Sequence, residues 1–410
     1  MSYAVINLEE TPRYENVANS APYRLSTVNH YWPLQTIQLT KGRNDIDRSD
    51  ELRNIEGSVS RLVDYFEPAG NLTERAYLNS FHVLLALSGF DWTYTAGAGT
   101  IATVGPNVTT VTGVNALNSA IVTVANNGGF PVSGTLNING ALVTYTGKSA
   151  DGLSFTGCGN HAAYVGGESV ADVLPVGTNK WVFNKRIGPV PRSAQIRLWY
   201  AEHSIGLQGQ GFGIDNLAIT AEGAVSASWT GLVYSRIGDP GLSPSVDVSS
   251  IRPALRGDMY LSWLANTATT DDFTIAIANA LNRRRTLSLV TPSKFSDVLE
   301  MADTRVAVTG TIPKTKLAAA DIDAVLSGAT FAAGATWTLP TNIGATNYPY
   351  TLDVDMPSCQ YTGGDAAELA NRRVFGHDLE FFAAWNEAAG YDARWTVVNA
   401  SSSIAAPFGT

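Results

Sequence analysis

The sequence predicts a mainly β protein built from two β-rich modules in tandem. Apolar and polar residues alternate across 350–357, and strand-like runs follow at 378–385 and 393–399. This period of two is typical of half-buried strands. A similar set of strand patterns lies upstream, between Trp181 and Arg236, and a short helix pattern precedes each set. Both helix patterns have the same exit, Leu87-Ser88-Gly89-Phe90 and Leu326-Ser327-Gly328-Ala329, which indicates an internal repeat.

The bulk composition fits a globular protein with a low density of charge. Of 410 residues, 45% are hydrophobic and only 15% are charged, so disorder is not expected. The formal net charge of -9 argues against a protein that grips DNA through a basic patch. It suits a surface that must not hold nucleic acid.

Targeting signals, metal sites and catalytic motifs are missing from the pattern. Cys158 and Cys359 are the only cysteines, and we expect two reduced thiols. The first residues have no signal-peptide character, and no apolar run approaches the length of a membrane span, so a soluble protein made in the cytoplasm is expected. The five histidines lack ligand spacing, and no nucleophile motif is present. We therefore expect neither an enzyme nor a cofactor.

The first module begins after a polar, irregular N-terminal arm, residues 1–30. Residues 34–40 alternate as a strand, and strand character resumes over 57–66. Between them, residues 41–56 mix acidic and basic side chains without an apolar period. This stretch is either a solvated loop or a long hairpin arm that reaches another subunit.

A short helix should follow this strand. Asn71 and Glu74 have capping-box spacing, which predicts a helix N-terminus at Asn71. An apolar face should pack inward, and Gly89 occupies the position of a C-cap glycine. His82 lies off the apolar stripe and is expected at the surface. The inward-facing residues would be Leu78, Phe81, Leu84 and Leu85.

Between residues 99 and 177 the composition changes to Thr, Val, Asn and Gly, with few charges. Asn139-Gly140 and Asp151-Gly152 are turn pairs of the hairpin type. We expect a small all-β domain inserted into the first module. Removing it would join Trp92 to the strand at Trp181, which is the same helix-to-strand step as in the second module.

The second module follows a Pro/Gly/Ser-rich connector. It should run through a strand at 272–279, a loop at 281–301, a strand at 304–312 and a short helix. The strand at 350–357 should end at Pro357, since proline has no N–H to give to a ladder. The helix would carry Leu317, Ile322, Val325 and Leu326.

Three groups of residues could suggest chemistry. Gly209-Gln210-Gly211 is glycine-rich, but a strand follows it where phosphate binding would need a helix N-terminus. Asp353 and Asp355 share one face of a strand and could pair as carboxylates or hold a cation, although polar residues facing solvent or a lumen are the more ordinary interpretation. Arg283, Arg284 and Arg285 fit either a solvated loop or an anchor to an acidic neighbour.

Several stretches share their pattern with one known family. They are Asp272-Phe273-Thr274-Ile275-Ala276-Ile277-Ala278-Asn279-Ala280-Leu281, Thr304-Arg305-Val306-Ala307-Val308-Thr309-Gly310-Thr311, Tyr350-Thr351-Leu352-Asp353-Val354-Asp355-Met356-Pro357 and Leu379-Glu380-Phe381-Phe382-Ala383-Ala384-Trp385. Through these four stretches, the chain resembles the tail tube (major tail) proteins of long, non-contractile-tailed bacteriophages over residues 31–399. Ser133-Gly134-Thr135-Leu136-Asn137-Ile138-Asn139-Gly140 and Tyr145-Thr146-Gly147-Lys148 resemble small β domains of phage virion proteins. Most such subunits carry one tube module, so two would be a departure.

The resemblance implies that each module is a β-sandwich or half-barrel with one flanking helix. The expected organisation is an arm (1–30), a first module (31–98 and 178–240), an inserted domain on the outer surface (99–177), a linker (241–257) and a second module (258–410). Copies would join one sheet into a barrel around a channel, which removes exposed sheet edges. We favour a homotrimer with a pseudo-sixfold ring over a homohexamer.

The resemblance further implies a structural virion protein of a siphophage tail, made in the host cytoplasm. Its rings would stack, contact the tape measure, tail terminator and distal tail proteins, and pass genomic DNA during ejection. A negatively charged lumen would repel phosphate, so DNA would not bind specifically. Charged loops would bridge rings, through Lys41, Arg43, Asp45, Asp47, Arg48, Asp50, Glu51, Arg283, Arg284 and Arg285. Ring-sheet residues would be Ile37, Leu39, Val59, Leu62, Phe273, Ile275, Ile277, Val306 and Val308.

Two other functions stay open. A tube-like protein of the tail tip or neck would share the fold but be present in few copies. A carbohydrate-binding or adhesin β protein would use 99–177, whose Thr, Asn and aromatic surface could contact host-surface sugars weakly. The absence of a secretion signal speaks against this last function.

Overall fold

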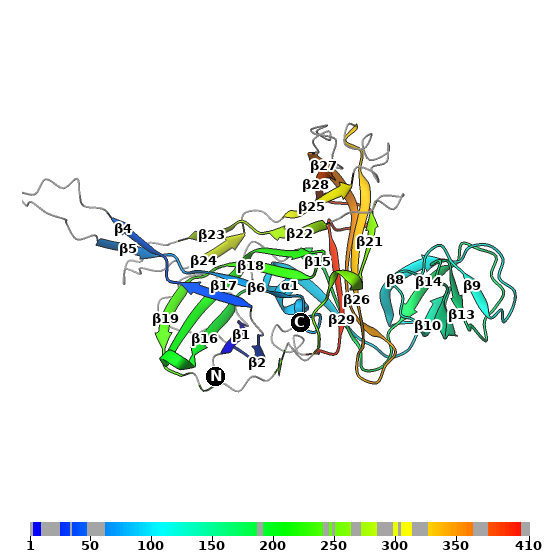
Figure 1. Cartoon of the computed structure of the whole chain (residues 1–410), viewed down its shortest axis with the longest axis horizontal. Coiled ribbons are helices and arrows are strands. Elements are labelled where there is room, and N and C mark those ends of the chain that lie inside the picture. The colour runs from blue at the N-terminus through cyan, green and yellow to red at the C-terminus, as the bar shows by residue number, and fades with distance from the viewer. Residues whose placement is uncertain are drawn as a thin grey trace, which may run out of the picture.

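The protein is mainly β in its computed structural model, as the sequence predicts (Figure 1). The structure describes residues 3–9, 25–32, 35–46, 62–186, 192–239, 241, 246–247, 251–263, 272–284, 298–301, 305–313, 327–363 and 376–402. Within these ranges the one complete α-helix, α1 (Phe81–Leu87), lies against a large sheet system of 18 strands. We call that sheet system and α1 the body.

Seven antiparallel ladders join eight strands of the body into one continuous sheet, which we call the main sheet. Its order is β3-β6-β18-β17-β22-β25-β28-β27. The strands span Thr36–Thr40 (β3), Ala69–Arg75 (β6), Ala224–Thr230 (β18), Ile205–Thr220 (β17), Asp272–Ala278 (β22), Arg305–Pro313 (β25), Gly376–Ala383 (β28) and Pro349–Gly363 (β27). The first four strands precede the last four in the chain, so we call the two sets the N-terminal and C-terminal quartets.

The two quartets have the same connections. In each, the first strand continues into a hairpin that leads back to the second strand: β4 (Arg43–Ile46) with β5 (Leu62–Phe66), and β23 (Leu281–Arg284) with β24 (Val298–Met301). The bend into each hairpin contains a left-handed residue, Gly42 at φ 52° and Ala280 at φ 45°. A Cβ at Gly42 would lie 2.1 Å from the Glu67 carbonyl oxygen, so this bend requires glycine.

Further strands form a second layer, and β17 and β27 belong to both layers. Around β17 lie β1 (Tyr3–Glu9), β2 (Leu25–Tyr31), β16 (Ala194–Tyr200), β19 (Val233–Ile237) and β20 (Val246–Asp247). Around β27 lie β7 (Phe90–Ala96), β15 (Asn179–Arg186), β21 (Met259–Trp263), β26 (Phe331–Asn342) and β29 (Arg394–Asn399). One apolar core fills the body, and its largest side chains include Trp181, Trp229, Trp337 and Trp395.

The N-terminal residues differ from the irregular arm expected for 1–30. Residues 3–9 form β1, which pairs with β16 of the body and with β2. The alternation of Ala4, Val5 and Ile6 is weak, but all three side chains are buried. The described part of the predicted arm is therefore built into the chain's own sheet.

The predicted helix start at Asn71 is wrong. Residues 69–75 form β6, where Leu72 and Glu74 point into the core while Asn71 and Thr73 are more exposed. The residues with capping-box spacing also alternate as in a strand, and backbone pairing with β3 and β18 selects the strand over the helix. Burial raises the pKa of Glu74 well above its usual value, and the Trp32 indole N–H donates to its carboxylate.

The helix itself begins ten residues later and is buried on every side. Leu78, Phe81, Leu84 and Leu85 are buried as predicted, and Gly89 ends the helix at φ 82°. The surface position expected for His82 is wrong, because its side chain is only 1% exposed. Its ring stacks on Trp181 at 5.0 Å, and Nδ1 lies 3.1 Å from the Asn399 amide nitrogen.

Residues 99–177, the 99–177 segment, form two sheets of their own at one end of the molecule (Figure 1). One sheet has the order β11-β10-β14-β8 and the other β12-β13-β9. The strands are Val104–Thr110 (β8), Ile121–Thr123 (β9), Gly134–Ile138 (β10), Ala141–Tyr145 (β11), Gly147–Lys148 (β12), Ser154–Thr156 (β13) and Ser169–Val173 (β14). The turn at Asn139-Gly140 joins β10 to β11 with both φ angles positive, as predicted.

Two predicted strand boundaries are wrong. The sequence also predicts one long strand from Val225 to Arg236, but this stretch divides into β18 and β19 at Gly231-Leu232, since the two pieces pair with different ends of β17. The strand expected to end at Pro357 continues to Gly363. Pro357 lies between two ladders of β27. Asp355 is the last residue that pairs with β29, and Cys359 is the first that pairs with β28. Neither ladder therefore requires an N–H at position 357.

Candidate assembly surfaces

One face of the main sheet carries mostly small, uncharged side chains, with Ser, Thr, Asn and Gln predominating in the N-terminal quartet and Ala in the strands that adjoin it. Cross-strand partners form rows on this face, for example Thr36, Thr73, Ser226, Ala218, Ala276, Ala307, Phe382 and Gln360 in order across all eight strands. A second row contains Gln38, Asn71, Ser228, Asn216 and Ala278. We call this surface the polar face. The opposite face carries buried residues such as Leu72, Leu217 and Ile277.

The polar face carries few charges among its described side chains. Those whose side chains are described are Arg75 on β6, Asp272 on β22 and Glu380 on β28. The ladders also place Arg305 opposite Ala278 and Asp378 opposite Thr311 in the rows of this face. The Arg75 guanidinium donates to the Glu222 carbonyl oxygen at 3.3 Å. Positive and negative residues nearly balance, so this face is close to neutral.

The main sheet ends in β3 on one side and in β27 on the other. At one end, β3 pairs with β6 and with no other described strand. At the other end, the ladder of β27 to β26 ends at Cys359, before β27 itself ends at Gly363. An open sheet edge presents backbone N–H and C=O groups that invite another strand.

The junction inside the chain shows how two such edges can join. There β17 offers Asn216–Thr220 and β22 offers 274–278, paired antiparallel from Asn216–Ala278 to Thr220–Thr274. In the order of the quartets, β17 corresponds to β27 and β22 to β3. The edge of β27 and the edge of β3 are therefore the same two types of edge that already pair within one chain.

The predicted charged loops begin as antiparallel hairpins, which favours the hairpin arm over the solvated loop for 41–56. Figure 1 shows β4–β5 extending from the body at the end opposite the 99–177 segment. Lys41 is exposed, and its ammonium lies 3.8 Å from the centre of the Phe66 ring; Arg43 is exposed as well. Asp45 lies in β4, whereas Asp47, Arg48, Asp50 and Glu51 fall outside the described residues.

Arg283 anchors its hairpin to the N-terminal quartet. Its guanidinium donates to the Pro68 carbonyl oxygen at 2.5 Å and to that of Gly231 at 3.3 Å, and lies 3.9 Å from Glu67. Of the two interpretations of the arginine run, the anchor holds for this residue, within its own chain. Arg284 pairs with Val298 in the hairpin ladder, and Arg285 falls outside the described residues.

The residues predicted for a ring sheet fall mostly in the main sheet. Leu39, Phe273, Ile275 and Ile277 are buried, and Ile37 is half-buried. Val306 and Val308 lie in β25, opposite Ile277 and Ile275. Leu62 instead pairs with Ile46 in the β4–β5 hairpin, because the sheet strand is the following β6. Val59 lies outside the described residues, as does most of the predicted second helix.

The sequence did not single out the residues of the polar face. Their signal is the alternation in Asn71-Leu72-Thr73 and in Val225-Ser226-Ala227-Ser228. Alternation alone identifies a polar face but not the strands that adjoin it. The rows appear only once the ladders place strands from distant parts of the chain side by side.

Asp353 and Asp355 do not lie on the polar face. They line a cleft of about 290 Å³ between the body and the 99–177 segment. Asp355 accepts hydrogen bonds from the Tyr391 hydroxyl at 2.7 Å and from Arg394 at 2.9 Å, and Asp353 accepts one from the Thr336 hydroxyl at 2.7 Å. Burial raises the pKa of Asp353 to about 7, and the Asp355 charge adds to the shift.

Other chemistry finds no support in the described residues. No group of three or more His, Cys, Asp or Glu side chains there could hold a metal ion. Cys158 and Cys359 are free cysteines, and both are buried. The Gly209-Gln210-Gly211 stretch lies inside β17 and is not followed by a helix. Within the described ranges, no helix combines the length and apolar character of a membrane span.

No protein-family model matches the chain, and no curated protein is significantly similar to it. The assignment of function therefore depends on the geometry of these surfaces.

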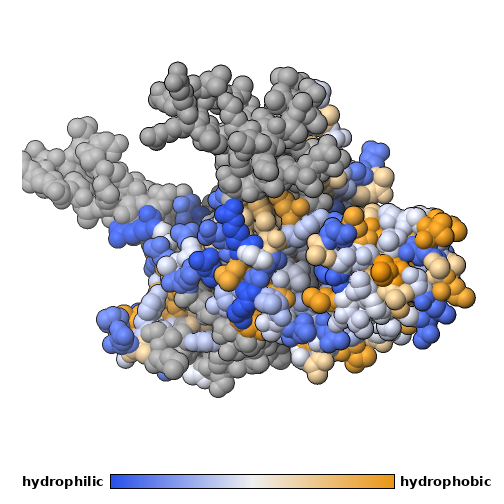
Figure 2. Space-filling model, turned by 45° about the vertical axis from the view of Figure 1, so that its right-hand side comes forward, coloured by the Kyte–Doolittle hydropathy of each residue, from blue (hydrophilic) through white to orange (hydrophobic). Residues whose placement is uncertain are grey.

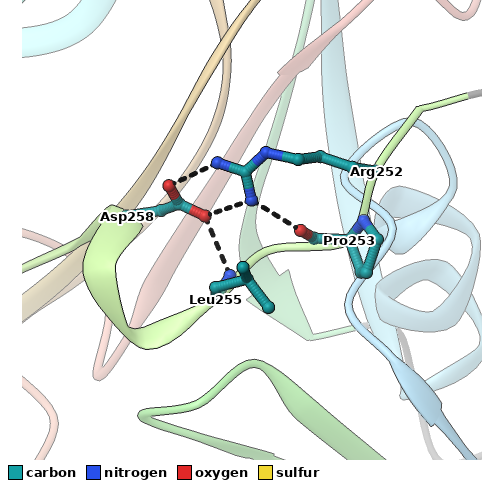
Figure 3. Close-up of polar contacts among 4 residues, drawn as sticks. All are labelled: Arg252, Pro253, Leu255 and Asp258. Carbon is teal, nitrogen blue, oxygen red and sulfur yellow. Dashed lines mark hydrogen bonds and ion pairs between the residues drawn. The ribbon is translucent and has the colours of Figure 1, made fainter.

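A short connector holds the two quartets in a fixed relation (Figure 3). The Arg252 guanidinium contacts both carboxylate oxygens of Asp258, at 2.6 and 2.8 Å, and donates to the Pro253 carbonyl oxygen at 3.1 Å. The Leu255 N–H donates to Asp258 at 2.9 Å. Ala254 is buried against the N-terminal quartet, and its N–H donates to the Ala76 carbonyl oxygen. The connector then enters β21, which pairs with β26.

Replacing Arg252 with alanine should lower the free energy of unfolding by about 1 kcal/mol, because a partly exposed bidentate ion pair is lost. Urea denaturation followed by tryptophan fluorescence measures this change. Arg252→Lys is the matched variant: it keeps the charge but not the two parallel hydrogen bonds, so its loss should be intermediate. Equal stability of R252K and the unaltered protein would show that the paired geometry contributes nothing.

Proposed function

We propose that the chain is the subunit of a hollow protein tube, the tail tube of a long-tailed bacteriophage. The observation that carries the proposal is that the two end strands of the main sheet, β27 and β3, correspond to β17 and β22, which pair inside the chain. Edges of these two types already pair at β17–β22 inside the chain. Repeating that pairing between β27 of one copy and β3 of the next extends the sheet without a new kind of contact.

A head-to-tail pairing of this kind closes into a ring or grows into a filament. The in-chain junction and the proposed junction between chains would be equivalent, so each chain supplies two of the repeating units. Three chains would then make a ring with pseudo-sixfold symmetry. The 99–177 segment acts in this proposal as an inserted domain of the first of two tandem tube modules, since the strands on either side of it, β7 and β15, pair directly.

The polar face would line the channel. Its hydroxyl, amide and methyl groups offer DNA neither the fixed cations that bind phosphate nor broad apolar contact with the bases. Binding to the phosphate backbone depends on Lys and Arg, and the ladders place only two described arginines on this face, Arg75 and Arg305. The proposal therefore replaces electrostatic repulsion with a weakly interacting, nearly neutral lining.

Negative-stain microscopy and mass photometry of the purified chain test the proposal. We expect rings or tubes with an open centre, and a ring mass three times the 43.6 kDa of one chain. A ring of six chains would keep the tube function but contradict the two-module arrangement. Isolated rings that never stack would favour the tail-tip or neck alternative. A protein that stays monomeric at high concentration would refute the proposal.

A second candidate function concerns the 99–177 segment. Figure 2 shows apolar surface gathered on this part of the molecule. Most of the exposed large apolar side chains of the described residues belong to it, including Val108, Val114, Leu117, Val132, Val165 and Val176. Exposed apolar groups favour contact with another surface, so the segment is our candidate for contact with the host surface. Cell adsorption that is unchanged after deletion of 99–177 would refute this role.

A further inference from the structure

The 99–177 segment contacts the body mainly through polar side chains, and Leu174, beside the neck, is the one described residue of the segment in the apolar core of the body. The segment's own core, which includes Phe155, Leu136 and Val170, is separate from the core of the body. Three side-chain hydrogen bonds cross the contact. The Tyr348 hydroxyl donates to Asp172, Lys180 donates to the Val104 carbonyl oxygen, and the Asn126 amide donates to the Tyr260 hydroxyl at 2.5 Å.

The contact is narrow, because a cleft lies on each side of it. The cleft of about 290 Å³ is lined by Asn107 and Asn126 of the segment and by Asp353 of the body. A second cleft, of about 160 Å³, is lined by Tyr145 and Asp172 of the segment and by Tyr348 of the body. Two backbone hydrogen bonds close the neck, from Gly97 N–H to the Thr178 carbonyl and from Gly99 N–H to the Leu174 carbonyl, both at 2.8 Å.

Asp172 lies at the centre of this contact and is only 1% exposed. The ladder between β14 and β8 is interrupted at Asp172. Ala171 pairs with Val108, whereas Val173 pairs with Val104, so the register shifts between them. The carboxylate fills the opening by accepting from the Asn107 backbone N–H at 3.1 Å and from the Asn107 amide at 2.7 Å. It is thus bonded both within its own segment and across to Tyr348.

We propose that Asp172 and Tyr348 form an acid-strengthened latch that fixes the 99–177 segment to the body. Docking places the carboxylate in a buried site, whereas a segment that swings away about its neck returns it to water. The latch depends on the described contact alone, so it holds whether or not the chain builds a tube.

The direction of the pH dependence follows from burial. Burial raises the pKa of Asp172 from 3.8 to about 6, and the hydrogen bonds from Tyr348 and Asn107 offset only part of this shift. A group whose pKa is higher in the docked state favours docking in its protonated form. The added stability is complete below pH 3.8 and is lost as the pH rises through about 6.

The other titratable groups that act on Asp172 do not reverse this direction. Burial raises the pKa values of Tyr348 and Tyr145, so both stay protonated. Burial lowers the pKa of Lys180, and its charge acts on Asp172 to favour the ionised form. Asp353, across the contact on β27, has a pKa raised to about 7 and acts in the same direction as Asp172.

Hydrogen exchange of the full chain tests the latch, with protection factors corrected for the intrinsic pH dependence of exchange. Peptides that span 104–108 and 346–350 should be about tenfold better protected near pH 5 than near pH 8. Asp172→Asn keeps an acceptor for Tyr348 but cannot titrate, so its protection should depend less on pH than that of the unaltered chain, and adding Asp353→Asn should remove the remainder. Tyr348→Phe should lower protection at every pH and retain the dependence.

Two results would overturn the proposal. One is protection of the unaltered chain that does not change with pH. The other is a pH dependence that is undiminished in Asp172→Asn and vanishes in Asp353→Asn, because it would assign the effect to the wrong carboxylate. Peptides from the core of the segment, around Phe155, report whether Asp172→Asn still folds. If Asp172→Asn does not fold, the variants Asp353→Asn and Tyr348→Phe still test the proposal, since the latch predicts that protection in both retains a pH dependence.

Discussion

A proline in β3 should abolish association between chains while leaving the single chain folded. Successive residues of a strand direct their N–H groups to opposite edges. Of the two neighbouring variants Ile37→Pro and Gln38→Pro, one therefore removes an N–H from the open edge of β3. The other removes an N–H from the ladder to β6 and should lower stability. The variant whose proline lies on the open edge loses backbone hydrogen bonds on which the proposed β27–β3 junction depends.

The size of the effect follows from the length of the junction. Losing about two to three backbone hydrogen bonds, each worth ~1 kcal/mol, weakens each junction roughly 100-fold. Sedimentation velocity should then show a monomer at concentrations where the unaltered chain forms rings. Near-UV circular dichroism confirms the fold and identifies which of the two prolines spares the β6 ladder.

Proline at an edge that takes no part in assembly provides the control. β19 pairs with β17 along one edge, and its other edge has no ladder to a described strand. The corresponding pair of proline substitutions, Tyr234→Pro and Ser235→Pro, should leave rings intact. Rings that survive every fold-competent β3 variant would rule out the β27–β3 junction. Rings lost equally with the β19 variants would show that proline acts through the fold.

Lysines on the polar face should turn a lining that ignores DNA into one that binds it. Ser226 and Ser228 lie on β18, near the middle of the N-terminal quartet, and their side chains point to the polar face. Two lysines in each of three chains would add about six phosphate contacts to a ring, and each contact steepens the salt dependence of binding. The unaltered assembly should show no comparable affinity.

Fluorescence anisotropy with a short single-stranded DNA measures this binding on assembled rings. Between about 50 and 200 mM salt, the affinity of the double lysine variant should fall by roughly 300-fold. Ser226→Gln with Ser228→Gln adds bulk without charge and should not bind. If the lysine rings bind no better than the glutamine rings, the polar face is not accessible to DNA and does not line a channel.

The sequence predicts the β class and most strand positions because alternation is a local property. The predictions for 272–279 and 393–399 agree with β22 and β29 to within one residue, and each strand carries a clear apolar face. Local signals mislead where two patterns coincide. Asn71 and Glu74 fit both a capping box and an alternating strand, and only the partners β3 and β18 distinguish them.

What the sequence could not show are contacts between distant residues. Nothing near His82 indicates that Trp181 and Asn399 enclose it. Likewise, the alternation of Asp353 and Asp355 does not reveal that the 99–177 segment covers one end of their strand, so a solvent-facing or lumen-facing position was expected. The open edges of the candidate assembly surface become visible only after all other ladders are assigned.

The pairing of β15 with β29 has a consequence for biosynthesis. Residues 179–183 lie against 395–399, and the Trp181 indole N–H donates to the Ser401 carbonyl oxygen at 3.1 Å. On the ribosome, β15 emerges more than two hundred residues before its neighbour. The layer that covers α1 therefore closes only after translation has reached the end of the second quartet, and until then the nascent chain has an incomplete wall beside its helix.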